Sequence, residues 1–411
     1  MSVGQTYVVI GAGQAGGRAV EAMRKSGFQG RVVLIGDEGH PPYERPPLSK
    51  DFLLGKVDAA STYLFKGADD LAAQDVELRL DDPVIAVSAD AQLVRLGSGN
   101  EIAFDRLMFA TGGRVRELRV PGADLDGVFY LRNLADAVGL SAALQSAERI
   151  VVIGGGFLGL EVAAVARQLR KQVTVLEIEK CVLGRALAPE LATIVTDLHR
   201  DRGTDFRLET AVAAIEGDGG RVRAVVCTDG VSLAADLVVA SIGIVPNDML
   251  AREAGIEVEN GILVNEYGET SRANFYAAGD VANHMNHAVG RRMRLESWQN
   301  AQNQAMAVAK VMCGERQPYA AIPWFWSDQF DVNVQLLGTP TEWDEICFRG
   351  EPASLKFSAF YLKDDKVVAA AAFNRSNDMR VARQLIASGK SIDPAVLCDT
   401  ALDIRKISQL L

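Results

Sequence analysis

Short apolar runs alternate with amphipathic stretches along most of the chain, which predicts alternating strands and helices. An apolar run at 7–10 precedes a glycine-rich turn and a stretch with apolar residues at helical spacing, and a second strand at 31–35 ends near Asp37. The same order of strand, glycine turn, helix, strand and acid returns at 150–177. The pattern therefore predicts one diverged internal repeat of strand–helix–strand units.

The remaining third of the chain first resumes this pattern and then changes character. Phe275 to Asp280 reads as a strand that ends in Gly-Asp, and apolar positions from 305 to 312 predict a helix. Beyond Pro318, β-branched and aromatic residues predict antiparallel strands. These strands are expected at 332–337, 355–362 and 366–373, followed by a helix near 379–388 and a short C-terminal helix.

The first glycine turn, Gly11 to Gly16, has the G-x-G-x-x-G spacing directly after a predicted strand and at the start of a predicted helix. Gly11 allows the tight turn, Gly13 lets the backbone approach a pyrophosphate, and Gly16 lets the helix pack closely on the strand. The negative pyrophosphate would then lie at a helix N-terminus. Asp37, about 20 residues further on, suits a ribose hydroxyl.

The second glycine turn repeats this arrangement with Gly154, Gly156, Phe157, Leu158 and Gly159. A single such string is weak evidence for a ligand, but here the strand, helix and acid are predicted around it twice. Glu177 ends the following strand, where a carboxylate accepts from the 2′-hydroxyl of NADH and repels the 2′-phosphate of NADPH. Although Lys180 could partly offset that repulsion, the turn predicts an NADH site.

Composition removes several other classes of function. The chain has 411 residues and a formal net charge of −10, which argues against a nucleic-acid binder. The sequence shows no secretory signal and no apolar run of membrane-spanning length, so a cytoplasmic protein is expected. Five scattered cysteines without a C-x-x-C pair predict buried thiols in a reducing compartment, and we expect no metal site.

Five motifs, in this order, make the chain similar to a known family over essentially its whole length. They are Arg45–Lys50 (RPPLSK), Ala110–Gly112 (ATG), the second glycine turn, Ala278–Asp280 (AGD) and Pro323–Gln329 (PWFWSDQ). The sequence resembles the FAD-dependent NADH–ferredoxin reductases of bacterial oxygenase systems, of the putidaredoxin reductase and biphenyl dioxygenase type.

The resemblance implies an α/β fold with two Rossmann-like dinucleotide-binding domains of the glutathione-reductase type and a C-terminal α+β domain. A discontinuous FAD-binding domain is expected at 1–114 and 246–319, an NADH-binding domain at 115–245, and the α+β domain at 320–411. FAD would remain at the first glycine turn, and NADH would visit the second.

The resemblance also assigns FAD contacts by position. Together with Gly11, Gly13 and Gly16, they are Ala15, Asp37, Arg45, Lys50, Val84, Thr111, Gly112, Arg132, Asp280 and Trp298. Arg45 matches only some members of the family. Asp280 could instead cap a helix, and Trp298 could be ordinary core. If the helix after Trp298 points its N-terminus at the flavin, its dipole would stabilise the anionic reduced flavin.

Lys50 and Glu161 match a pair that lies on the nicotinamide side of the flavin in related proteins, and they are the candidate catalytic residues. A buried pair would hold both charges and leave Glu161 able to accept from a carboxamide. Glu161 could instead be an exposed acid in the first turn of a helix. Phe157 could cover the flavin until nicotinamide displaces it, or it could be core.

The implied reaction passes a hydride from NADH to FAD and then electrons to a [2Fe–2S] ferredoxin that serves a Rieske dioxygenase of aromatic hydrocarbon catabolism or a cytochrome P450. A disulfide reductase is disfavoured. Coenzyme A disulfide reductases carry their cysteine in the segment that matches residues 43–50, and this chain has no cysteine there. A rubredoxin reductase and an apoptosis-inducing-factor-like flavoprotein are the alternatives. Docking of an acidic ferredoxin is expected at Arg291, Arg292 and Arg294, with Trp326 or Trp324 on the electron path, unless this loop is simply solvated.

Overall fold

The computed structural model describes residues 4–65 and 68–407, which form two compact units. Of the described residues, the first unit holds 4–45, 58–65, 68–114 and 245–324, and the second holds 46–57, 115–244 and 325–407. The chain passes between them at 45–46, 57–58, 114–115, 244–245 and 324–325, and the third and fourth of these crossings lie in β8 (Gly113–Val115) and β17 (Ile244–Pro246). No helix within the described ranges is long and apolar enough to cross a membrane. The boundaries of the three predicted domains remain a prediction.

The first unit is built on a five-stranded, all-parallel sheet in the order β19-β7-β1-β2-β3. Along the chain these strands are β1 (Thr6–Ile10), β2 (Arg31–Ile35), β3 (Val76–Arg79), β7 (Arg106–Phe109) and β19 (Phe275–Ala277). Because the strands are parallel, their carboxyl ends lie along one edge of the sheet. The segments that follow β1, β2, β7 and β19 therefore meet at that edge.

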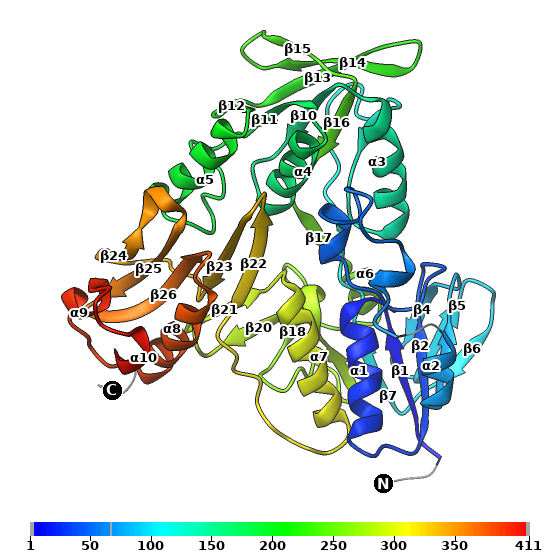
Figure 1. Cartoon of the computed structure of the whole chain (residues 1–411). Coiled ribbons are helices and arrows are strands. Elements are labelled where there is room, and N and C mark those ends of the chain that lie inside the picture. Colours follow the sequence, from blue (N-terminus) through cyan, green and yellow to red (C-terminus); the bar gives the residue numbers. More distant parts are fainter. Residues whose placement is uncertain (1–3, 66–67, 408–411) are drawn as a thin grey trace. The chain divides into compact units, whose positions relative to one another are not determined.

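Each face of this sheet buries alternate residues of the same strands. Tyr7 and Val9 of β1 join one apolar cluster, and Val8 and Ile10 join another. The first cluster includes residues of α1 (Gln14–Lys25) and α7 (Trp298–Met312), which lie side by side on one face (Figure 1). Helix α7 confirms the helix predicted from the apolar spacing at 305–312.

Smaller elements complete the first unit. A three-stranded antiparallel sheet comprises β4 (Val84–Ser88), β5 (Leu93–Leu96) and β6 (Glu101–Ala103). A second small sheet comprises β18 (Ile262–Val264), β20 (Ala282–Asn286) and β21 (Arg291–Arg294). The short helices are η2 (Ala60–Thr62), α2 (Ala68–Ala73), α6 (Met249–Glu253) and η3 (Gly279–Val281).

The second unit repeats the parallel sheet, in the order β12-β11-β10-β16-β9. Its strands are β9 (Val128–Phe129), β10 (Arg149–Ile153), β11 (Gln172–Leu176), β12 (Thr204–Arg207) and β16 (Leu237–Ala240). Its helices are η1 (Pro46–Ser49), α3 (Leu134–Ser146), α4 (Phe157–Gln168) and α5 (Pro189–Asp201). An antiparallel sheet of β13 (Val212–Asp218), β14 (Arg221–Cys227) and β15 (Ser232–Ala234) is attached.

The C-terminal part of this unit is a five-stranded sheet in the order β22-β23-β26-β25-β24. The predicted strands are present as β23 (Val332–Leu337), β25 (Lys356–Lys363) and β26 (Lys366–Phe373). Two edge strands were not predicted, β22 (Trp324–Gln329) and β24 (Glu345–Glu351). The helical elements are η4 (Pro352–Ser354), α8 (Ser376–Ser388), α9 (Pro394–Cys398) and α10 (Ile404–Ile407). The predicted fold class, two parallel α/β sheets and an α+β segment, is confirmed.

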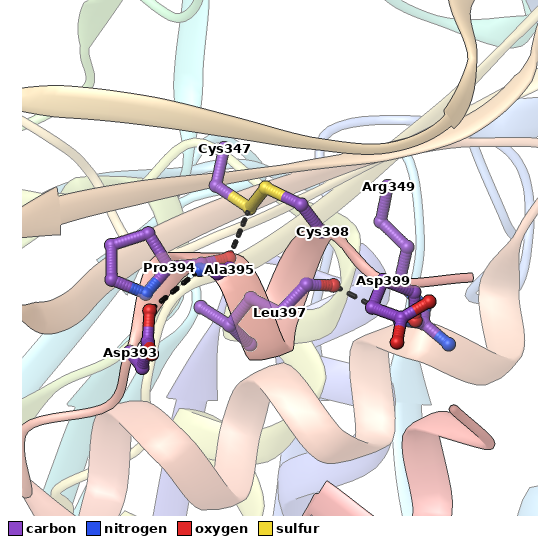
Figure 2. The surroundings of a disulfide bond; sticks show 8 residues. All are labelled: Cys347, Arg349, Asp393, Pro394, Ala395, Leu397, Cys398 and Asp399. Carbon is purple, nitrogen blue, oxygen red and sulfur yellow. Dashed lines mark hydrogen bonds between the residues drawn. A yellow bond between two sulfur atoms is a disulfide. The ribbon is translucent and has the colours of Figure 1, made fainter. Parts of the chain in front are cut away.

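One expectation about the cysteines is wrong. Cys347 on β24 and Cys398 at the end of α9 form a disulfide, with their Cα atoms 5.9 Å apart (Figure 2). The two residues are 51 positions apart in the chain, so their spacing gave no sign that α9 lies against β24. Arg349 donates to the carbonyl oxygens of Leu397 and Asp399 at 3.0 and 2.5 Å, which holds the same segment to β24.

Candidate active site

The first glycine turn connects β1 to α1 at the carboxyl edge of the sheet. Gly11 has φ +108°, and a Cβ there would lie 2.3 Å from the Ala110 carbonyl oxygen. A Cβ on Gly16 would lie 1.9 Å from the Gly11 carbonyl oxygen. At Gly13, by contrast, the nearest described atom is in the Arg45 guanidinium, 3.9 Å away. The outer glycines are required by the backbone, whereas the middle one leaves room for another group.

Arg45 supplies positive charge beside this open position. Its guanidinium pairs with Glu38 at 2.7 Å and lies over the Tyr43 ring. Burial alone would lower the pKa of Arg45, but Tyr43, Glu38 and Asp280 together raise it above its ordinary value. A fixed cation and the free N–H groups at the start of α1 suit a pyrophosphate. The residues therefore fit the cofactor implied by the sequence.

Asp280 lies next to the first glycine turn, although it follows Gly16 by 264 positions in the chain. It follows β19 in a turn where Gly279 has φ +79°. A Cβ on Gly279 would lie 3.0 Å from the Cβ of Ala15, so the two turns are in contact. The Gly279 N–H donates to the Gln304 side chain at 2.9 Å, which attaches the turn to α7.

Helix α7 begins at Trp298, as the sequence hypothesis requires. Ser297 caps it by accepting from the Asn300 N–H at 3.1 Å. The position of a Cβ on Gly279 is 3.7 Å from Ala301, so the first turn of α7 lies beside the Asp280 turn. The N-terminus of α7 is thus placed at the same edge of the sheet as the first glycine turn.

Four other predicted FAD contacts of the first unit lie at or near the ends of its strands. Thr111 and Gly112 follow β7, the neighbour of β1, and the Thr111 hydroxyl donates to the Asn247 carbonyl oxygen at 2.7 Å. Asp37 is exposed after β2, and Val84 is buried at the start of β4.

Sequence reasoning missed Glu38, which carries the contacts with Arg45 and Tyr43. The adjacent acids Asp37 and Glu38 were the available signal, but spacing alone could not choose between them. Lys50 and Arg132 belong to the second unit, so their predicted contacts with FAD remain predictions.

The second glycine turn has the same construction. Gly154 also has φ +108°, and a Cβ there would lie 2.3 Å from the Ser241 carbonyl oxygen. A Cβ on Gly159 would lie 2.2 Å from the Gly154 carbonyl oxygen. No atom of the described chain lies within 4 Å of a Cβ built on Gly156. Here too, the middle glycine leaves open space at the start of a helix, α4.

Glu177 follows β11 and is fixed against this turn. One carboxylate oxygen accepts from the Gly155 N–H at 2.6 Å, and the other accepts from the Glu179 N–H at 2.9 Å. Each oxygen keeps a second lone pair for another donor. The neighbouring strand β11 therefore places a carboxylate at the turn, where a ribose hydroxyl would need an acceptor.

Lys50 and Glu161 form the ion pair that the sequence predicted. The Lys50 Nζ lies 3.0 Å from a Glu161 oxygen, and the Glu161 side chain on α4 is only 7% exposed. Ser49 and Ser327 also donate their hydroxyls to this carboxylate, the latter at 2.5 Å. Burial excludes the alternative of an exposed helix acid. Three donors balance the charge that burial would otherwise disfavour.

Alternate residues of β22 make three successive contacts within the second unit. The ring of Phe325 lies 4.4 Å from that of Phe157, Ser327 bonds Glu161, and the Gln329 side chain lies 2.9 Å from the His199 ring nitrogen Nε2. These three residues share one face of the strand. Sequence reasoning missed Ser327 and Gln329, because it read PWFWSDQ as a motif and not as an alternating strand, and it missed Ser49 and His199 because only tertiary packing brings them to these partners.

The predicted docking arginines lie on or beside β21 but do not form an open cluster. Arg292 donates to the carbonyl oxygens of Val264 and Asn283 at 3.1 and 2.7 Å. Arg294 pairs with Glu296 at 2.6 Å, and its side chain is 8% exposed. Of these three arginines, Arg291 is the exposed one whose side chain makes no such contact with the described part of the fold. Trp326 lies beneath the Lys50 Nζ, 5.8 Å from its ring centre.

Comparison with known proteins agrees with this geometry. Residues 5–305 match the family described as pyridine nucleotide-disulphide oxidoreductase, and residues 324–408 match the reductase C-terminal family. Putidaredoxin reductase of Pseudomonas putida is 39% identical, over 99% of this chain and 97% of that protein. The ferredoxin–NAD(+) reductase component of the anthranilate 1,2-dioxygenase system of Burkholderia cepacia is 41% identical, over 97% of this chain and 98% of that protein.

A solved structure gives the same result for the fold. The reductase in the covalent putidaredoxin reductase–putidaredoxin complex superposes with a TM-score of 0.96 and 38% sequence identity. The match covers 100% of this chain and 99% of that one.

Proposed function

We propose a division of roles between two sites in this chain, which belongs to the pyridine nucleotide-disulphide oxidoreductase family and is an NADH-dependent ferredoxin reductase. It binds FAD and NADH and passes electrons from NADH through FAD to a ferredoxin. The observation that carries the assignment of sites is the doubled glycine turn. In both copies the outer glycines are fixed by backbone contacts, and the middle glycine is left open beside a helix start.

The first turn is the proposed FAD site. Its pyrophosphate would lie against Gly13 and Ala15, with Arg45 as the cation, and Asp280 would accept from a ribitol hydroxyl. Supporting these roles, Gly279 lies against Ala15, and Asp280 contributes to the raised pKa of Arg45. Further proposed contacts, from the family match, are Gly11, Gly16, Asp37, Lys50, Val84, Thr111, Gly112, Arg132 and Trp298. When bound, FAD accepts a hydride from NADH and releases electrons to the acceptor.

The second turn is the proposed NADH site, formed by Gly154, Gly156, Phe157, Leu158 and Gly159. Glu177 would accept from the adenosine ribose, because backbone N–H groups already aim its carboxylate at this turn. Glu161 would accept from the nicotinamide carboxamide, while Lys50 keeps the carboxylate charge balanced. These two side chains act on orientation, since the hydride chemistry belongs to the cofactors.

We propose that the ferredoxin is of the [2Fe–2S] type and serves a Rieske aromatic-ring dioxygenase or a cytochrome P450 in the cytoplasm. Support comes from the relatives named for such systems and from residues 43–50, which contain no cysteine. Of the predicted docking residues, Arg291 is the one we propose for electrostatic steering, with Trp326 near the exit route.

The test is reduction of cytochrome c by purified holoprotein with NADH, with and without a [2Fe–2S] ferredoxin. We expect a rate that depends on ferredoxin concentration, and no comparable rate with a rubredoxin in its place. A rubredoxin-supported rate that equals or exceeds the ferredoxin-supported rate would show that the acceptor is wrong. If the rate of NADH oxidation does not depend on either acceptor protein, the result would instead favour the apoptosis-inducing-factor-like alternative.

A further inference from the structure

A continuous hydrogen-bond chain runs from the buried His199 ring to the Glu161 carboxylate. The His199 Nε2 lies 2.9 Å from the Gln329 side-chain oxygen, and the Gln329 side-chain nitrogen lies 2.7 Å from the Ser327 hydroxyl oxygen. The Ser327 hydroxyl lies 2.5 Å from Glu161. All four residues are within the second unit, and all are buried.

The Glu161 carboxylate at the end of this hydrogen-bond chain decides which group donates at each step. The Glu161 carboxylate can only accept, so the Ser327 hydroxyl donates its proton to it. The Ser327 oxygen then accepts from the Gln329 amide NH₂, which leaves the Gln329 carbonyl oxygen facing His199. His199 therefore carries its proton on Nε2. Every donor in the chain points toward Glu161, and each member has one arrangement that satisfies its neighbours.

The His199 ring is held in this arrangement by its surroundings. It lies between the rings of Phe206 and Phe330, with centroids 6.0 and 4.9 Å away, and is fully buried. Burial lowers the pKa of His199 to about 4, so the imidazole is neutral near pH 7. Its Nδ1 has no hydrogen-bond partner among the described residues, which leaves Nε2 as the nitrogen that donates.

We propose that Ser327 and Gln329 are positioning residues that hold one oxygen of Glu161 at a fixed angle to receive the nicotinamide carboxamide. Lys50 and Ser49 balance and anchor the carboxylate but come from a different segment, at the end of η1. The chain through β22 adds a contact from the C-terminal sheet, so that sheet helps to aim the nicotinamide. The inference rests on the proposed role of Glu161 and extends it to residues that touch no ligand.

The experiment compares two ligands on oxidised holoprotein by isothermal titration calorimetry. One is the tetrahydronicotinamide analogue of NADH, which keeps the carboxamide but cannot donate a hydride. The other is ADP-ribose, which lacks the nicotinamide. For S327A we expect affinity for the analogue to fall about 5- to 10-fold, the size of one ordinary hydrogen bond, because Ser327 acts on the ligand only through Glu161. Affinity for ADP-ribose should be unchanged, and Q329L should give the same selective loss at a smaller magnitude.

S358A is the matched control, because Ser358 is buried in the same unit and donates to the Asp378 carboxylate at 2.8 Å. It should leave the ratio of the two affinities unchanged. Equal losses for both ligands in S327A, or no loss for either, would overturn the inference.

E161Q separates this inference from the proposed function. If E161Q weakens the analogue selectively but S327A and Q329L do not, Glu161 binds the carboxamide without help from β22, and only the present inference fails. If E161Q also leaves the ratio unchanged, the assignment of Glu161 to the nicotinamide fails, and this inference fails with it.

Discussion

Glu177 is the single residue to which we assign the choice between NADH and NADPH. Its carboxylate is fixed by two backbone N–H groups, so it cannot easily turn away from a phosphate on the adenosine ribose. A buried or partly buried like-charge contact of this kind strongly disfavours the charged ligand. Under the proposed assignment, the choice between NADH and NADPH would depend on the charge of this one side chain, whose position is set by the turn.

We expect E177Q to raise kcat/KM for NADPH at least about 10-fold relative to NADH, because it removes the like-charge repulsion while keeping a hydrogen-bond acceptor. Initial rates with an artificial acceptor at saturating concentration would measure this ratio. E179Q is the control, since Glu179 is exposed two positions away. An unchanged ratio in E177Q would mean that another feature excludes NADPH.

His199 makes a second residue-scale prediction, about pH. Its pKa is about 4 in the folded protein and would return to its ordinary value, near 6.5, on unfolding. Between these values the unfolded chain binds a proton that the folded chain does not, so the free energy of unfolding falls as the pH falls. The loss from this residue is on the order of 3 kcal/mol and is complete near pH 4.

Urea unfolding of wild type and H199Q at pH 7 and pH 4.5 would measure this effect. The difference in unfolding free energy between the two pH values should be smaller in H199Q than in wild type. H287Q, which replaces an exposed histidine, should keep the full difference. The same pH difference in H199Q as in wild type would contradict the lowered pKa.

At the scale of elements, periodicity predicted the parts of the fold that depend on local pattern. The strands at 31–35, 332–337 and 366–373 were located to the residue, because their apolar runs are bounded by turns. The glycine turns were predicted because their backbone geometry restricts residue type at fixed spacing. The sequence could also pair Lys50 with Glu161, but only through resemblance to a family, since Glu161 follows Ser49 by 112 positions in the chain.

What periodicity could not provide was contact between distant segments. Strand β22 carries Phe325, Ser327 and Gln329 on one face, yet its aromatic residues obscure the alternation, and the partners lie on α4 and α5. The disulfide between Cys347 and Cys398 was not predicted from the sequence for the same reason. Both depend on how the C-terminal sheet folds back, which is a property of tertiary packing and not of local spacing.

At the scale of the whole molecule, net charge and local charge have different consequences. The chain carries a formal charge of −10, so an acidic ferredoxin would meet overall repulsion, and we expect it to approach through a local basic patch. The basic cluster predicted from the sequence is smaller in the structure, because Arg292 donates to backbone carbonyl oxygens and Arg294 pairs with Glu296. Arg291 and Arg292 are both exposed, and we propose Arg291 for steering because its side chain is not tied to the carbonyl oxygens that hold Arg292.

We expect R291Q to lower the ferredoxin-dependent rate of cytochrome c reduction about 2- to 5-fold at low ionic strength and to weaken its dependence on salt. The rate with a small uncharged acceptor should not change, because that acceptor is not steered. R221Q is the control, an exposed arginine on β14. A salt dependence identical to wild type would show that Arg291 does not contribute to association.

The open middle position of each glycine turn has a genetic consequence. Gly11, Gly16, Gly154 and Gly159 are constrained by the protein's own backbone, so selection for folding alone would retain them. A Cβ at Gly13 or Gly156 meets no such obstacle, so we expect occupancy by a ligand to be the stronger constraint at these two positions. Positions 154, 156 and 159 are therefore under different selection, although all three lie within six residues. In a lineage that lost its nicotinamide cofactor, residue 156 would change while Gly154 and Gly159 were kept.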